Sequence, residues 1–174
     1  RVEGGYKALR NYLLSELERL TEKFNFIILG GYTGSGKTLV IPQIENSIDL
    51  EGLANHRGSS FGRQVSPQPS QISFENKLAI ALMKAEVAGH ETIVLEDESF
   101  LIGRCALPKS FHEKVKQAPV VLLQKTQAQR EQQIHQEYVE AQLTNYKTAY
   151  GDSAGFSQFS NYLTSSLKKI KKRL

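Results

Sequence analysis

The sequence predicts an α/β fold, in which an open parallel sheet carries helices on both faces and a helical C-terminal extension follows. Three observations lead to this prediction. Short apolar runs at residues 25–30, 92–95 and 119–123 are typical of strands buried on both faces. Segments with apolar residues at helical spacing separate these runs, and such alternation favours a parallel sheet. No strand pattern is present after residue 124.

The first half of the chain is expected to place one strand before a glycine-rich turn. Leucines recur at helical spacing over residues 6–23, which predicts a lead-in helix. The strand over 25–30 ends in glycines, and a helix over 37–45 follows. A second strand over 47–50 leads into residues 55–71, where Gly, Ser, Pro and Arg predict a loop that is long enough to suggest a function.

The second half continues the alternation. Apolar residues over 74–85 predict a helix that ends at Gly89, before the strand over 92–95. Pro108 suits the first turn of a helix that continues to residue 116. The run 119–123 is expected to be the last strand.

The C-terminal third is expected to be helical. Residues 127–150 are polar with a sparse apolar stripe, and residues 154–173 have the pattern of a final helix. We therefore divide the chain into an α/β core over 1–125 and a helical extension over 126–174. With 174 residues, 40% hydrophobic and 23% charged, the chain can bury one core, which excludes a wholly disordered or fibrous protein.

Several classes of protein are excluded by simple counts. No apolar run is long enough to cross a bilayer, so we expect no membrane partner and a cytoplasmic location. The single cysteine, Cys105, allows no internal disulfide and is expected to be a buried structural thiol. The first residues contain neither an initiator Met nor a signal sequence, so we expect the chain to be a piece of a longer protein.

Residues 31–38, Gly-Tyr-Thr-Gly-Ser-Gly-Lys-Thr, fit the phosphate-binding pattern G-x-x-x-x-G-K-[ST] in full. Glycines let successive backbone N–H groups point at phosphate oxygens, and the next helix is expected to add its positive pole. Because a predicted strand precedes the motif and a predicted helix follows it, we expect a P-loop NTPase-like fold and not a simple glycine-rich turn. The residues expected to bind the phosphates of a nucleotide or diphosphate are Gly31, Thr33, Gly34, Ser35, Gly36, Lys37 and Thr38.

The acids that end the strand at 92–95 predict a metal site. In P-loop proteins a carboxylate at this position holds Mg²⁺ together with the hydroxyl of the loop. We expect Thr38 with Asp97 or Glu96 to be the ligands, and favour Asp97. Lys37 and Asp97 are the residues expected to take part in catalysis.

The segment after the second strand is expected to hold a substrate, because loops at the carboxyl ends of parallel strands form the binding crevice. Its donors suit a phosphate or a nucleotide. His56 is also considered as a general base, although a hydrogen-bonding role fits it better, and a merely solvated loop is the alternative for the whole segment. The residues concerned are Asp49, Asn55, His56, Arg57, Ser59, Ser60 and Arg63.

The net charge of +4 permits an anionic partner without requiring one. A basic run near the C-terminus would favour RNA phosphates. The alternative is a solvated helix end, where cations suit the negative pole of the helix. The run comprises Lys168, Lys169, Lys171, Lys172 and Arg173.

Together these segments resemble the P-loop half of bacterial tRNA 2-selenouridine synthases. The resemblance is densest up to about residue 110, and its most specific part is the run Asn-His-Arg-Gly-Ser-Ser over 55–60 beside the P-loop. The segments that carry it are residues 2–7, 29–38, 49–62, 68–71, 74–76, 95–99 and 102–103.

The resemblance implies a transferase that modifies tRNA, converting 2-thiouridine at the wobble position to 2-selenouridine. In this family a geranyl group from geranyl diphosphate is understood to be attached to the sulfur, and selenium from selenophosphate then replaces the product. The family also carries an N-terminal rhodanese-like domain with a cysteine linked to selenium transfer. We expect these 174 residues not to include that domain, and Cys105 not to take the place of its cysteine.

Three functions are therefore considered. In the first, the P-loop holds the diphosphate of geranyl diphosphate with Mg²⁺ while the basic segments bind tRNA. In the second, the loop holds ATP or GTP, and the domain is a kinase-like phosphotransferase or an NTPase. In the third, the chain is a tRNA-binding module whose P-loop is structural. The oligomeric state is left open.

Overall fold

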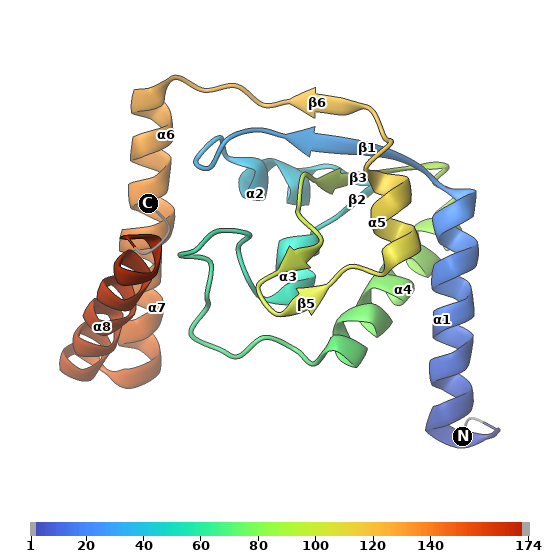
Figure 1. Ribbon diagram of the computed structural model, residues 1–174, viewed down its shortest axis with the longest axis horizontal. Helices are drawn as coiled ribbons and strands as arrows, with labels where there is room; N and C mark the ends of the chain where they lie inside the picture. Colours follow the sequence, from blue (N-terminus) through green and yellow to red (C-terminus); the bar gives the residue numbers. More distant parts are fainter. Residues whose placement is uncertain (1–2, 172–174) are drawn as a thin grey trace.

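The computed structural model describes residues 3–171 and confirms the predicted fold class (Figure 1). Four parallel strands form the sheet in the order β2-β3-β1-β6, and two more form a small antiparallel hairpin. The strands are β1 Asn25–Gly30, β2 Ser47–Ile48, β3 Thr92–Glu96, β4 Leu101–Ile102, β5 Cys105–Ala106 and β6 Val120–Leu122. The helices are α1 Gly5–Lys23, α2 Lys37–Val40, η1 Ile41–Gln43, α3 Leu50–Ala54, α4 Gln71–Val87, α5 Lys109–Val115, α6 Gln127–Ile134, η2 His135–Glu140, α7 Ala141–Tyr150 and α8 Asp152–Lys171.

One face of the sheet carries the main core. Phe26 pairs in register with Ile93, and Ile28 with Leu95, so these four apolar side chains share one face. All four are buried in one cluster with side chains of α1, α4 and α5. The Phe26 ring meets Phe111 of α5 edge to face, with 5.4 Å between the ring centroids. Burial of this apolar face fixes the positions of β1 and β3, and therefore of the loops that follow them.

The other face is covered more thinly, because the helix after the glycine-rich loop is shorter than the 37–45 predicted. It ends at Val40, and a 3₁₀ turn with Pro42 at its start follows. Proline has no backbone N–H and its ring clashes with the preceding turn, so it stops the helix. Ile41, the first residue of this turn, is fully buried.

The second strand is also shorter than the predicted 47–50. Asp49 has an extended backbone, and its Oδ1 accepts the N–H of Gly52 at 2.6 Å, which makes Asp49 the N-cap of α3. Leu50 is therefore the first residue of a helix and not the last of a strand. This shift turns Glu51 into a helical residue.

The hairpin β4–β5 was not predicted. Gly103 and Arg104 form its two-residue turn, and Gly103 has a φ of 62°. Cys105 is 1% exposed, which confirms a buried thiol, and burial raises its pKa. Gln68 fastens the hairpin to the loop before α4, because its Nε2 donates to the Ile102 carbonyl at 2.9 Å.

The C-terminal extension is helical, as predicted, and packs on the core. Thr126 and Gln129 form a capping box that starts α6. Helices α7 and α8 pair through Tyr146, Phe159 and Tyr162. Figure 1 shows α6 beside the end of β1, and α7 and α8 next to the loop that joins α3 to α4. The predicted boundary at residue 125 falls between β6 and α6.

Within residues 3–171, no helix combines the length and the apolar character that crossing a bilayer requires.

Candidate functional site

The glycine-rich loop leaves four backbone donors free. Among residues 3–171, the N–H groups of Gly34, Gly36, Lys37 and Thr38 have no protein acceptor, whereas the Ser35 N–H donates to the Tyr32 carbonyl at 2.9 Å. Gly34 and Gly36 have φ values of 82° and 91°, which only glycine adopts without strain. Free N–H groups in such a turn form a concave site for an anion.

Lys37 folds back over this loop. Its Nζ donates to the Gly31 carbonyl at 2.7 Å, so the ammonium group lies at the mouth of the loop. The loop lines a cavity of about 260 Å³. Because α2 has only four residues, its dipole adds little, and the free N–H groups and Lys37 would supply most of the attraction for phosphates.

Carboxylates from two other elements line the same cavity. Asp97 and Glu98 follow β3, as predicted for Asp97, and Glu51 comes from α3. The Thr38 hydroxyl donates to Glu51 Oε2 at 3.3 Å, and Glu51 Oε1 accepts the Gly58 N–H at 2.5 Å. The prediction from sequence missed Glu51 and Glu98, although both lie within the segments that carry the family resemblance.

The charges in this cavity bear on the predicted metal site. Four acidic side chains line it with a single lysine, and one of them, Glu137, is paired with Arg57. That leaves Glu51, Asp97 and Glu98 to face Lys37. Burial, followed by the neighbouring Glu51 carboxylate, raises the pKa of Glu98 to about 8. Mg²⁺ bound here would offset the negative charge of the acidic side chains and bind phosphate oxygens as well. The residues that would hold it are Thr38, Asp97 and Glu51; no cluster of three or more His, Cys, Asp or Glu ready for a metal occurs within residues 3–171.

Glu96, the other predicted metal ligand, lies elsewhere. Its side chain is 1% exposed, and its Oε2 accepts the Leu50 N–H at 2.8 Å. It does not line the P-loop cavity. The alternation of side chains along β3 separates it from Asp97, so the structure favours Asp97 over Glu96 as a ligand.

The burial of Glu96 predicts a pH dependence of stability. Burial, followed by the carboxylate of Asp49, raises its pKa from the ordinary 4.5 to about 9. Between these values the folded chain keeps a proton that the unfolded chain releases, so the free energy of unfolding falls as the pH rises, by at most about 1.4 kcal/mol per pH unit for one group. Glu98 acts in the same direction. We expect Glu96→Gln to reduce the slope without abolishing it.

Thermal unfolding between pH 5 and pH 9 checks this expectation. Glu18→Gln on exposed α1 is the matched control, and it should leave the slope unchanged. An identical slope in the Glu96→Gln variant and the unmutated chain would contradict the account.

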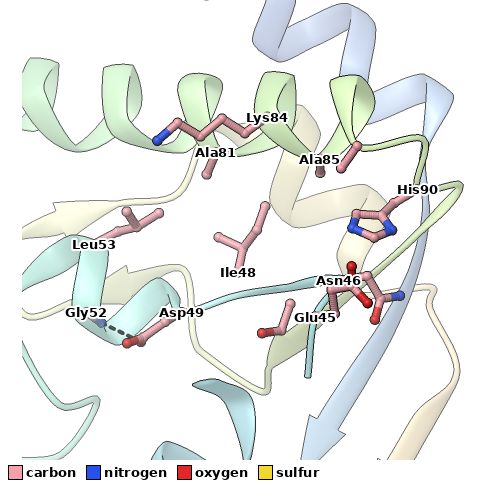
Figure 2. A pocket seen from close by; sticks show the side chains of 12 residues that line it. Glu45, Asn46, Ile48, Asp49, Gly52, Leu53, Ala81, Lys84, Ala85 and His90 are labelled. Atoms are coloured by element: carbon pink, nitrogen blue, oxygen red, sulfur yellow. Dashed lines mark hydrogen bonds between the residues drawn. The ribbon is translucent and has the colours of Figure 1, made fainter. Parts of the chain in front are cut away.

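Two residues of the predicted substrate loop are structural. Asp49 caps α3 and faces a hollow of about 520 Å³ between β2 and α4, away from the P-loop (Figure 2). Asn55 ends α3 with a φ of 49°, and its Nδ2 donates to the carbonyls of Ser66 and Pro67 at 3.0 and 3.1 Å. Its role is to hold the two ends of the loop together.

Arg57 joins the loop to the C-terminal helices. Its guanidinium pairs with Glu137 at 2.8 Å and lies 5.3 Å from the centroid of the Tyr138 ring. A second arginine joins the C-terminal helices to the P-loop. The Nε of Arg130, on α6, donates a hydrogen bond to the Thr33 carbonyl at 3.1 Å. The C-terminal extension therefore forms one wall of the P-loop cavity, to which Glu137 and Tyr138 contribute.

The remaining loop residues line a second cavity of about 640 Å³. It lies between the loop, the β4–β5 turn and α8. Ser59 lines both cavities. Burial lowers the pKa of His56, which is therefore neutral near pH 7, and its Nδ1 has no partner among the described residues. The predicted residues at this cavity are His56, Ser59, Ser60, Arg63 and Lys169.

The other residues of the predicted basic run are not gathered at a site. Lys168 and Lys171 are exposed on α8 and line neither cavity. Lys172 and Arg173 lie outside the described residues. Of the run, Lys169 is the residue that the structure brings beside other candidate binding groups.

Comparison with known proteins relates this geometry to a family. A sequence model described as the tRNA 2-selenouridine synthase AAA domain matches residues 24–174. The chain belongs to the tRNA 2-selenouridine synthase family. The matched region contains the P-loop, the carboxylates and the C-terminal helices that close the cavity.

Curated relatives of the tRNA 2-selenouridine synthase family match along almost the whole chain. The protein of that name from Marinobacter nauticus is 51% identical over 173 residues, which are 99% of this chain and 47% of the relative. Those from Shewanella frigidimarina and Verminephrobacter eiseniae are 50% and 44% identical, over 99% and 100% of this chain and 47% and 48% of the relatives. The chain thus spans about half the length of these relatives. No solved structure matches it.

Proposed function

We propose that this chain is the donor-binding domain of a tRNA-modifying transferase that converts 2-thiouridine to 2-selenouridine through a geranylated intermediate. The observation that carries the proposal is the P-loop itself, with four free N–H groups and Lys37 beside the carboxyl groups of Glu51, Asp97 and Glu98. Such a site suits a magnesium diphosphate. The names of the relatives support tRNA as the acceptor.

The chemistry explains why the donors would sit at the diphosphate. In the transfer, the allylic C–O bond of geranyl diphosphate breaks and a C–S bond to the thiouridine forms. The diphosphate leaves with the bonding electrons, and the N3 proton of the thiouridine is released to solvent. Negative charge grows on the leaving oxygen, so the loop N–H groups and the Lys37 ammonium stabilise the transition state more than the ground state. Mg²⁺ would neutralise part of the same charge. Selenophosphate would serve the later selenium step.

A calorimetric titration of the 174-residue chain tests the proposal against its alternatives. We expect geranyl diphosphate to bind in the presence of Mg²⁺ and to bind far more weakly without it, because the acidic side chains of the cavity then repel the anion. Inorganic diphosphate is the control for the phosphate contacts alone. Binding of Mg–ATP but not of geranyl diphosphate would favour a kinase or NTPase, and binding of neither would favour an RNA-binding module with a structural P-loop.

A further inference from the structure

The second cavity differs from the P-loop cavity in its charge. Its lining contains the cationic side chains of Arg63, Arg104 and Lys169 and no carboxylate. None of these three side chains forms an ion pair within residues 3–171. Like charges that converge on one hollow without partners repel each other, so the site gains stability when an anion enters.

Three separate elements build this cavity. Arg63 comes from the loop before α4, Arg104 from the β4–β5 turn and Lys169 from α8. The Tyr162 hydroxyl of α8 donates to the Phe61 carbonyl, which fixes the helix against the loop. The Arg104 N–H donates to Gln68 Oε1 at 2.9 Å, which fixes the turn. These hydrogen bonds fix the backbone segments that carry the three cationic side chains.

The hollow between β2 and α4 provides a contrast. Its lining mixes Glu45 and Asp49 with Lys84 around the apolar side chains Ile48 and Leu53, as Figure 2 shows. Opposite charges there cancel, so it offers no site for a polyanion. Of the P-loop cavity, the second cavity and this hollow, the second cavity alone is lined by cationic side chains without any carboxylate.

The position of the second cavity links it to the reaction. Ser59 lines it and also the P-loop cavity, so the segment around Ser59 is the wall between the two. His56 also lines the second cavity. A neutral imidazole offers a hydrogen bond to the edge of a nucleobase. The volume of about 640 Å³ is within the range of sites that hold a ligand of nucleotide size.

We propose that the second cavity binds a nucleotide unit of the acceptor RNA, with Arg63, Arg104 and Lys169 on its phosphates, and directs the neighbouring base past Ser59 toward the P-loop. The inference rests on the proposed function in one respect, which is that RNA is the acceptor. The donor and the acceptor would then occupy adjacent cavities with opposite electrostatic character.

Fluorescence anisotropy with a labelled tRNA anticodon stem–loop tests the inference. The variant is the triple substitution Arg63→Ala, Arg104→Ala and Lys169→Ala. Loss of three phosphate contacts should reduce the slope of log K against log salt by about 2, which corresponds to about 100-fold weaker binding at 0.1 M salt. The matched control, with the same change in net charge on exposed α4, α5 and the turn after α5, is Lys84→Ala, Lys109→Ala and Lys116→Ala.

The outcomes separate this inference from the proposed function. All three cavity cations are exposed, so the variant should fold, which a thermal melt checks. Equal weakening by the cavity and control triples, or no weakening by either, would overturn the cavity as the RNA site. The affinity of the cavity triple for Mg–geranyl diphosphate should be unchanged. Failure of the unmutated chain to bind geranyl diphosphate would remove the proposed donor, whatever the RNA result.

Discussion

The Lys37→Ala variant is expected to bind Mg–diphosphate about 10- to 150-fold more weakly than the unmutated chain, since a hydrogen bond to a charged group contributes about 1.5–3 kcal/mol. Lys37 is the one cation among the residues that line the P-loop cavity within residues 3–171. Its Nζ already lies at the loop, 2.7 Å from the Gly31 carbonyl, so little rearrangement is needed for it to reach a phosphate. Calorimetry on both proteins measures the loss.

Two further substitutions make the Lys37 result specific. Lys109→Ala removes a lysine whose side chain is 86% exposed at the start of α5, and it should leave the affinity unchanged. Lys37→Arg keeps the charge but places a planar group where a point charge fits, so it should restore the affinity only in part. Diphosphate binding at the normal affinity in Lys37→Ala would show that the loop does not hold the phosphates.

The Gly34→Ala variant is expected to lose both stability and phosphate binding. A Cβ at this position would lie 2.5 Å from the Arg130 carbonyl oxygen and 2.8 Å from Ile134 Cγ1. The first of these is a backbone atom of α6, so either the helix or the loop must move. Because Gly34 also has a φ of 82°, we expect the free energy of unfolding to fall by about 1–3 kcal/mol. We expect the affinity for diphosphate to fall as well, because the free N–H groups of the loop no longer converge.

Gly89→Ala is a close control for this substitution. Gly89 has a φ of 80°, but no atom lies within 4 Å of the position its Cβ would take. It therefore carries the same backbone strain without the contact to α6. Denaturant unfolding of both variants isolates the contact, and equal losses in the two would mean that α6 does not seat on the P-loop as described.

The sequence was most informative where a local pattern determines the backbone. The motif over 31–38 encodes its own turn, because positive φ angles require the glycines, and the apolar runs of β1 and β3 have few other uses than buried strands. The hairpin around Gly103 and Arg104 was not predicted, although the sequence contains a pattern that indicates it. Two apolar pairs separated by two turn residues are typical of a β-hairpin.

The sequence was least informative where contacts join distant residues. Reading Asp49 as the end of a strand, and not as a helix cap, hid Glu51 from the predicted site. The pairing of Arg57 with Glu137 spans 80 positions and has no local signal. For the same reason, the second cavity could not be predicted, because its three cations come from elements that meet only in the folded chain.

The central claim is that the P-loop holds the diphosphate from which an organic group passes to tRNA. Its most direct test is mass spectrometry of the wobble nucleoside, after the full-length protein has been incubated with 2-thiouridine tRNA, geranyl diphosphate and Mg²⁺. The account predicts a geranylated nucleoside with unmutated protein and at least about tenfold slower formation with Lys37→Ala, in line with the loss of a charge-assisted contact. Geranylation at an equal rate in the two proteins would contradict it.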